Sequence, residues 1–185
     1  MVRTGEISRV FLTGYMGSGK TFIGKVLSDK LSWQFIDLDQ RISDAESQSI
    51  STIFETQGER YFRELEYQEV AKICKYNGQN IISLGGGAFV QENINNLIRE
   101  DEHSIVVYLK FDALILAKRL KNEKHKRPLI AHAKDLEEFI EDHLAERSAF
   151  YERADLIIVN EEDAMQTINQ ISTYLNYRNQ KLSTI

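Results

Sequence analysis

The chain has 185 residues and a mass of 21.4 kDa, a length that one α/β domain fills and that two full domains would strain. Its 23 Lys and Arg against 28 Asp and Glu give a net charge of −5, which argues against nucleic acid as the main partner. The apolar runs are about five residues long where a bilayer span needs about 20, and the single cysteine, Cys74, with no apolar leader in residues 1–8, gives no sign of secretion, so we expect a cytoplasmic protein without a membrane span.

The predicted elements alternate between strand and helix from the beginning of the chain. Residues 10–12 form a short β-type run, and after a glycine-rich turn the apolar spacing at residues 22–31 is helical. A second strand is expected at 35–38, followed by helices at 40–46 and 51–57. Gly58 is expected to stop the latter helix before a long helix at 59–76 and a third strand at 80–84.

The second half of the chain continues this alternation. We expect a helix at 91–99, a strand at 104–109, a helix at 113–122, a polar stretch to residue 134 and a helix capped by Asp135 that runs through residue 151. A fifth strand is expected at 156–159, and a last helix at 163–177 with Met165, Ile168, Ile171 and Leu175 facing inward. Five strands separated by helices predict an α/β domain in three α/β/α layers around a parallel sheet.

Residues 14–21, with the sequence GYMGSGKT, match the phosphate-binding loop pattern in full and lie between a predicted strand and a predicted helix. Backbone N–H groups of this turn and of the helix N-terminus would bind phosphate oxygens. Lys20 would reach the terminal phosphates, and the Thr21 hydroxyl could bind Mg²⁺. The motif predicts a nucleoside triphosphate site but does not separate kinases from GTPases or ATPase motors.

Three further groups of residues lie near the carboxyl ends of the strands, where folds of this class bind ligands. Asp37 and Asp39 end the second strand as alternate carboxylates, which we expect to face one way. The triplet at residues 85–87, GGG, ends the third strand, where bare backbone lets a ligand approach closely. Arg63 and Glu66 lie three residues apart on one face of the long helix.

Together these motifs resemble those of the shikimate kinases. The resemblance is carried by the segments GYMGSGKT, FIDLD, IFETQGERYFRELE, SLGGG, KRPLIA and ERSAFYERADLIIV, in the family's order over residues 14–159. It implies one domain over residues 1–185, a strand order of 2-3-1-4-5, a lid at about residues 122–134 and substrate-binding helices at about residues 40–76. The implied activity is transfer of the γ-phosphoryl group of MgATP to the 3-hydroxyl of shikimate.

The resemblance also implies which residues bind the nucleotide. Arg127 matches the lid arginine that neutralises charge on the transferring phosphoryl group. Arg119 matches an arginine that stacks on adenine, although Lys118, Lys121 and Lys124 are alternatives on the same segment. The residues implied to bind ATP are Gly14, Gly17, Ser18, Gly19, Lys20, Thr21, Phe22, Arg119 and Arg127.

For the metal and the acceptor, the resemblance implies that Thr21 and Asp37 hold Mg²⁺ and that Asp39 orients the acceptor hydroxyl and takes its proton. An alternating Asp pair at a strand end is otherwise a helix N-cap with a solvated neighbour. The implied catalytic residues are Lys20, Asp39 and Arg127. The implied acceptor-binding residues are Asp39, Arg63, Gly85, Gly86, Gly87 and Arg147, with Glu66 holding an arginine in place.

The cations are concentrated in one part of the chain. Residues 110–134 contain eight cations and two anions, so this window carries +6 and the rest of the chain −11. It is either a solvated surface or a site for a small polyanion. We expect its cations to lack protein partners and residues 122–134 to be mobile without ligand.

Two other functions remain as alternatives. A kinase of another small hydroxy acid, such as gluconate, would share the loop and lid, and a catalytically silent nucleotide-binding module would share the fold. The presence of Lys20, Asp39 and a lid arginine disfavours the silent module. Ser83 ends the third strand where many phosphate-loop ATPases have Asp, which disfavours motors and leaves Mg²⁺ to Thr21 and Asp37. We expect a monomer that binds shikimate and neither nucleic acid nor membrane.

Overall fold

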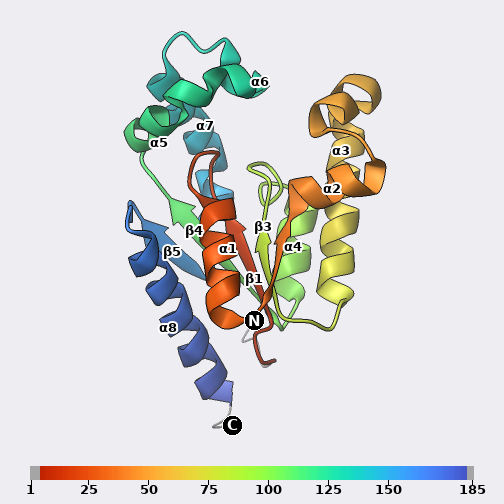
Figure 1. Cartoon of the computed structure of the whole chain (residues 1–185), viewed down its shortest axis with the longest axis vertical. Helices are drawn as coiled ribbons and strands as arrows, with labels where there is room; N and C mark the ends of the chain where they lie inside the picture. The colour runs from red at the N-terminus through yellow and green to blue at the C-terminus, as the bar shows by residue number, and fades with distance from the viewer. Residues whose placement is uncertain (1–4, 183–185) are drawn as a thin grey trace.

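The computed structural model of the chain describes residues 5–182, and the side chains of these residues except 124–126, 128 and 182. Five strands form one sheet: β1 (Arg9–Thr13), β2 (Gln34–Asp37), β3 (Asn80–Ser83), β4 (Ser104–Lys110) and β5 (Leu156–Val159). All neighbouring strands are parallel and their order is β2-β3-β1-β4-β5, which confirms the expected order 2-3-1-4-5 (Figure 1).

Helices lie on both faces of this sheet and extend beyond its carboxyl ends (Figure 1). The α-helices are α1 (Lys20–Leu31), α2 (Leu38–Glu46), α3 (Ile50–Lys75), α4 (Glu92–Glu100), α5 (Ala113–Leu120), α6 (Pro128–Ala131), α7 (Leu136–Tyr151) and α8 (Ala164–Leu182), with a 3₁₀-helix η1 at Lys121–Lys126. Within α3, Gly58 adopts φ 82° and ψ 169°, so the predicted interruption at this glycine is confirmed. None of the helices in the described range is both long and apolar enough to cross a bilayer.

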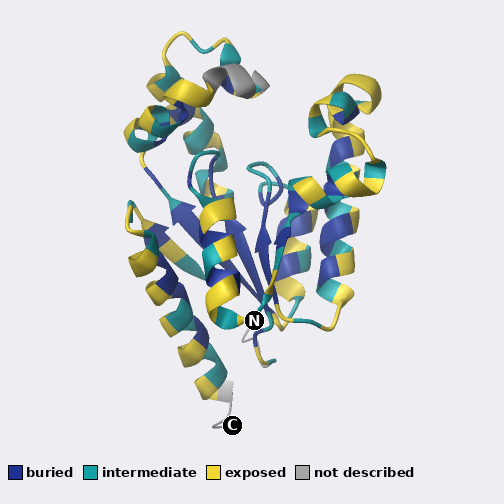
Figure 2. Cartoon of the chain, viewed as in Figure 1, coloured by how far each residue is buried: buried dark blue, intermediate teal, exposed yellow. Residues whose placement is uncertain are grey.

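The core consists of two hydrophobic clusters, one on each face of the sheet. Successive β1 side chains alternate between them, because a strand directs neighbouring residues to opposite faces. Val10 and Leu12 pack with residues of α1, α5 and α8, whereas Phe11 packs with residues of α2, α3 and α4. All five β1 residues are buried, as Figure 2 shows for the central strands, so β1 supports both layers.

Three parts of the predicted secondary structure were wrong. The helix expected at 113–122 ends at Leu120 and continues as η1, and the expected polar stretch contains α6, whose Ile130 is fully buried in the core. The last helix continues to Leu182, and Met165 is 53% exposed rather than inward, because the buried stripe begins one turn later. The helix α2 begins at Leu38, directly after β2, so Asp39 lies in a first helical turn and not on the strand.

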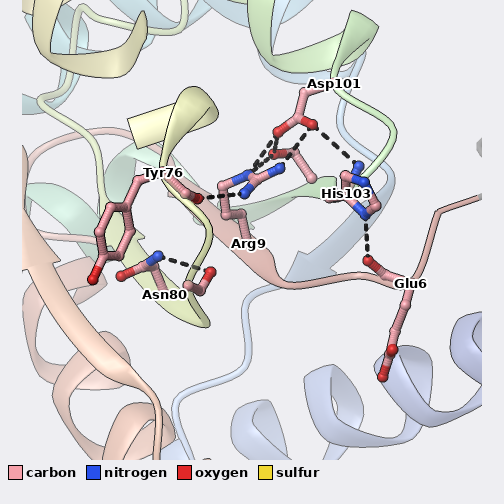
Figure 3. Close-up of polar contacts among 8 residues, drawn as sticks. Glu6, Arg9, Tyr76, Asn80, Asp101 and His103 are labelled. Atoms are coloured by element: carbon pink, nitrogen blue, oxygen red, sulfur yellow. Dashed lines mark hydrogen bonds and ion pairs between the residues drawn. The ribbon is translucent and has the colours of Figure 1, made fainter. Parts of the chain in front are cut away.

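A buried ion pair holds the amino ends of the central strands, at the edge opposite the glycine-rich loops (Figure 3). Arg9 of β1 is 4% exposed and donates to both carboxylate oxygens of Asp101, at 2.7 and 2.9 Å, and to the Tyr76 carbonyl at 3.0 Å. Burial raises the pKa of Asp101, but hydrogen bonds from Arg9 and Ser104 outweigh it and hold the pKa below its usual value. The pair therefore joins β1 to the end of α3 and to the turn before β4.

Replacing Asp101 with Ala should leave the Arg9 guanidinium buried without its counterion. Breaking a buried pair from one side costs about 3–5 kcal/mol, and we expect a loss of that size in the free energy of unfolding, measured with denaturant. The matched control is Glu152→Ala in the exposed Lys110–Glu152 pair, which should cost about 0–1 kcal/mol. Because the folded pKa of Asp101 is depressed, the difference from wild type should shrink as the pH falls below about 4. Equal small losses in both variants would contradict this assignment.

Candidate active site

A cleft of about 390 Å³ opens at the carboxyl ends of the strands. Its lining includes residues of α5 and η1 and, from α2, Asp39. Figure 1 shows where α5 and α2 lie relative to the sheet. The predicted site residues that line it are Gly17, Gly19, Lys20, Thr21, Phe22, Asp37, Asp39, Gly86, Arg119 and Arg127. A neighbouring hollow of about 660 Å³ beside β2 shares Thr21, Asp37 and Asp39. The structure thus brings the phosphate loop, both aspartates and two arginines of the basic window to one place.

The phosphate loop owes its shape to glycines at positive φ. Gly14 has φ 143°, and a Cβ there would lie 2.7 Å from the Leu109 carbonyl oxygen, so no larger residue fits. Gly19, with φ 89°, is the N-cap of α1. Lys20 folds back over the loop and donates from Nζ to the carbonyls of Gly14 at 2.8 Å and Tyr15 at 3.0 Å. Burial lowers the pKa of Lys20 to about 8, against the opposing effect of Asp39.

Two residues that are predicted to bind the nucleotide, Ser18 and Phe22, differ strongly in solvent exposure. Ser18 is buried beneath the turn, and its N–H donates to the Tyr15 carbonyl at 3.2 Å. Phe22 is 62% exposed on the first turn of α1. Ser18 therefore shapes the loop from inside, while Phe22 presents an apolar ring at the cleft mouth.

Thr21 and Asp37 place two oxygen atoms that could ligate a metal ion next to the phosphate loop. The Thr21 hydroxyl donates to Asp37 Oδ2 at 2.9 Å, and Ser83 Oγ lies 3.4 Å from the same hydroxyl. The other Asp37 oxygen accepts from the Gln40 N–H at 3.3 Å, so Asp37 is also the N-cap of α2. Hydroxyl and carboxylate oxygens are ligands that Mg²⁺ accepts, and it needs only one or two from protein when phosphates supply others. These residues therefore fit a Mg²⁺ ion bound together with a nucleotide.

A fully buried carboxylate, Glu66, organises the other half of the site. Its Oε2 accepts from Arg63 Nη1 and from Gln91 Nε2, each at 2.7 Å, which confirms that Glu66 holds an arginine. Burial raises the pKa of Glu66 to about 7, while the charge of Arg63 opposes the shift. Arg63 also donates to Glu59 at 2.9 Å, so its guanidinium is fixed from two sides.

The bare backbone of the glycine triplet lets two carboxylates approach each other. A Cβ on Gly85 would lie 2.8 Å from Asp39 Oδ1 and 3.0 Å from Glu66 Oε1, two buried oxygens that accept no hydrogen bond from the described residues. Burial, and then the nearby Asp37, raise the pKa of Asp39, although Lys20 and Arg63 oppose this. A Cβ on Gly87 would likewise lie 3.0 Å from the Arg63 guanidinium. Side chains at 85 and 87 would thus displace the groups around this loop.

Arg147 of α7 lies near the phosphate loop. Its guanidinium carbon lies 5.9 Å from the centre of the Tyr15 ring, in the phosphate loop. One turn later on α7, the Tyr151 hydroxyl donates to the Gly86 carbonyl. Neither Arg147 nor Arg63 lines the 390 Å³ cleft. Arg63 lies against Gly87, and Arg147 lies one turn before Tyr151, the residue that bonds Gly86.

The expectation that the basic window lacks protein partners was wrong. Arg127 donates from Nε and Nη2 to Glu123 Oε2 at 3.0 and 2.7 Å. Arg119 donates to the Gly17 carbonyl at 3.2 Å, and its guanidinium lies 4.1 Å from the centre of the Phe111 ring. The acidic partner of Arg127 comes from η1 one helical turn away, a pairing that charge counts along the chain do not show. The side chains of residues 124–126 lie outside the described part.

Sequence reasoning missed three residues of this site. Gln91 supports Glu66, Tyr151 bonds the Gly86 carbonyl, and Glu123 holds Arg127. Gln91 and Glu123 lie outside the quoted motifs, and Tyr151 lies within ERSAFYERADLIIV but had no role assigned to it. Only their distances in the folded chain identify them.

A family model, a related sequence and two solved structures that are similar to this chain are all of shikimate kinases. A model of the family described as shikimate kinase matches residues 16–176. A shikimate kinase from Flavobacterium psychrophilum is 34% identical over 172 residues, covering 91% of this chain and 99% of that protein. The structure of shikimate kinase from Acinetobacter baumannii in complex with shikimate is 27% identical, with a TM-score of 0.83 over 92% of this chain and 94% of that one. The structure of shikimate kinase from Bacteroides thetaiotaomicron is 32% identical, with a TM-score of 0.81 over 91% and 98%.

Two neighbouring glycines offer a matched test of the packing around the triplet. Gly85→Ala should lower the free energy of unfolding by about 1–3 kcal/mol, because the methyl group overlaps Asp39 and the pinned Glu66. At Gly86 the nearest atoms to an added methyl group lie at 3.8 and 4.0 Å, so Gly86→Ala should change stability by less than about 0.5 kcal/mol. Denaturant unfolding of both variants measures the difference, and equal stabilities would refute the contact.

Proposed function

The chain belongs to the shikimate kinase family, and we propose that it transfers the γ-phosphoryl group of MgATP to the 3-hydroxyl of shikimate, yielding shikimate 3-phosphate and ADP. One observation carries the proposal: Lys20 of the phosphate loop and Asp39, beside the acceptor arginine Arg63, meet at one cleft. Phosphoryl transfer needs positioning and charge neutralisation more than covalent chemistry, and this arrangement supplies both.

On the nucleotide side, the loop from Gly14 to Thr21 would bind the phosphates through its N–H groups and the α1 N-terminus. Lys20 would exchange its two carbonyl partners for phosphate oxygens. Arg119, already against Phe111 at the cleft wall, is positioned to cover the base, with Phe22 at the mouth. When bound, Mg²⁺ would neutralise charge on the β- and γ-phosphates, held by Thr21 and, through water, by Asp37.

On the acceptor side, Asp39 would orient the 3-hydroxyl and take its proton as the new phosphorus–oxygen bond forms and the bond to ADP breaks. Arg63 and Arg147 would bind the shikimate carboxylate through their planar N–H groups, with the Gly86 N–H beside them. Glu66 would keep Arg63 in place, and Gln91 would hold Glu66. Arg63 Nη1 and Gln91 Nε2 each lie 2.7 Å from Glu66 Oε2.

The segment at about residues 122–134 would act as the lid of a single-domain enzyme. In closing, Arg127 would leave Glu123 for the transferring phosphoryl group and help to exclude water, the competing acceptor. One chain supplies the phosphate loop, both aspartates and the arginines, so a monomer would suffice for the proposed reaction. A dependence on ATP and a single cysteine support a cytoplasmic location.

The proposed reaction is tested by coupled ADP release with shikimate, gluconate and other hydroxy acids as acceptors. We expect ADP release that depends on shikimate, because two guanidinium groups and a carboxylate match its carboxylate and ring hydroxyls. Lys20→Met should abolish it and thereby exclude a contaminating kinase. Equal or faster turnover of gluconate would reject shikimate as the substrate, and no acceptor-dependent turnover at all would indicate a silent module.

A second prediction concerns the proposed lid arginine. Arg127→Ala should lower kcat by about 10²–10³, as loss of a contact to developing transition-state charge does, with little change in the Kd for ATP. The matched control is Arg153→Ala, which breaks another exposed Arg–Glu pair, with Glu92 at 2.9 Å, and should leave kcat unchanged. A normal kcat in the Arg127 variant would show that residues 122–134 are only a charged surface segment.

A further inference from the structure

Two residues of α7 present polar groups to the acceptor side, one helical turn apart. Arg147 and Tyr151 are spaced i, i+4 and therefore share a helix face. Tyr151 is fully buried, and its ring stacks on Tyr108 of β4, with the ring centres 4.9 Å apart and the planes at 30°. Stacking requires only the ring, so the hydroxyl of Tyr151 needs a separate explanation.

The hydroxyl of Tyr151 connects two parts of the proposed acceptor site. It donates its proton to the Gly86 carbonyl, which has no proton to offer in return. Its lone pairs therefore remain for a donor, and Arg147, four residues earlier on α7, shares its helix face. Burial raises the pKa of Tyr151, while the charge and side-chain hydrogen bond of Arg147 lower it. The group is thus a neutral phenol that donates to the loop at residues 85–87 and keeps its lone pairs available to the Arg147 side chain.

A second tyrosine, Tyr15, also lies near Arg147. The ring of Tyr15 lies 5.9 Å from the guanidinium carbon, and its hydroxyl lies 3.2 Å from His143 Nδ1. His143 is also on α7, one turn before Arg147, so α7 touches the phosphate loop and the glycine triplet together. Arg147 consequently neighbours Tyr15 of the phosphate loop and shares a helix face with Tyr151, which bonds the loop at residues 85–87.

We propose that Tyr151 is a positioning residue for the acceptor site, whose hydroxyl fixes the Arg147 guanidinium relative to the Gly86 backbone. This inference rests on the proposed function, because it assigns Tyr151 to the two groups that would bind the shikimate carboxylate. The residue does not touch the reacting atoms. Its effect reaches the substrate only through Arg147 and the loop at residues 85–87.

The stacked pair supplies its own matched control. Tyr151→Phe keeps the stack and removes the bridging hydroxyl, whereas Tyr108→Phe removes the hydroxyl of the partner ring, for which the described part of the chain offers no hydrogen-bond partner. Because hydrogen bonds that position charged groups are the stronger ones, Tyr151→Phe should raise KM for shikimate about tenfold. KM for ATP should not change, and Tyr108→Phe should leave both constants at wild-type values.

A double variant separates positioning from general weakening of the fold. In an Arg147→Ala background, Tyr151→Phe should raise KM for shikimate by clearly less than in the wild type, because the residue through which it acts is gone. The full tenfold effect in that background, or an unchanged KM in the single variant, would overturn the inference while leaving the proposed function intact. No shikimate-dependent ADP release by the wild-type protein would instead reject the proposed function itself.

If Phe at this position prevents folding, 4-aminophenylalanine at position 151 provides a second test. It retains a donor for the Gly86 carbonyl and is a poorer acceptor for Arg147. KM for shikimate should still rise with this residue, and a wild-type KM would overturn the bridging role.

Discussion

A carboxylate with no exposed surface determines the acceptor half of this molecule. Glu66 lies inside α3, where a buried charge persists only if partners replace the water that it has lost. Arg63 and Gln91 supply those partners, and Gly85 is bare because any side chain would meet both Glu66 and Asp39. Through these contacts this one group links α3, the loop at residues 85–87 and the start of α4.

The two edges of the sheet are stabilised in different ways. At the amino ends, the Arg9 guanidinium donates to both carboxylate oxygens of Asp101 (Figure 3), although Oδ1 of the nearby Asn80 has no hydrogen-bond partner among the described residues. At the carboxyl ends, Asp39 Oδ1 and Glu66 Oε1 are buried yet accept no hydrogen bond from the described residues. The first arrangement contributes stability. The second costs stability and leaves hydrogen-bonding capacity at the site of the proposed chemistry.

Local sequence predicted the strands and most helices because periodicity and glycines act over a few residues. The apolar run at residues 10–12 and the break at Gly58 are examples. The strand order came from the family resemblance, since periodicity carries no information about which strands are neighbours. For the aspartates of FIDLD the sequence allowed two interpretations, a continued strand or a helix N-cap, and the structure shows that Asp37 caps α2.

The contacts that hold the arginines could not be predicted in the same way. Arg127 pairs with Glu123 at i, i+4 spacing, which requires a helical turn in the segment that was expected to be a polar stretch. Tyr151 has the spacing of an ordinary core aromatic, which it also is. Its hydroxyl acquires a role only because the fold carries the loop at residues 85–87, more than 60 positions away in sequence, to the same point.

The central claim is that the acceptor binds between Asp39, the loop at residues 85–87 and the arginines Arg63 and Arg147. A crystal structure of the protein with shikimate and MgADP tests it most directly. The account predicts the shikimate carboxylate within hydrogen-bond distance of both guanidinium groups and the 3-hydroxyl against Asp39. Shikimate bound elsewhere, or with its carboxylate on other cations and Asp39 unengaged, would contradict the account.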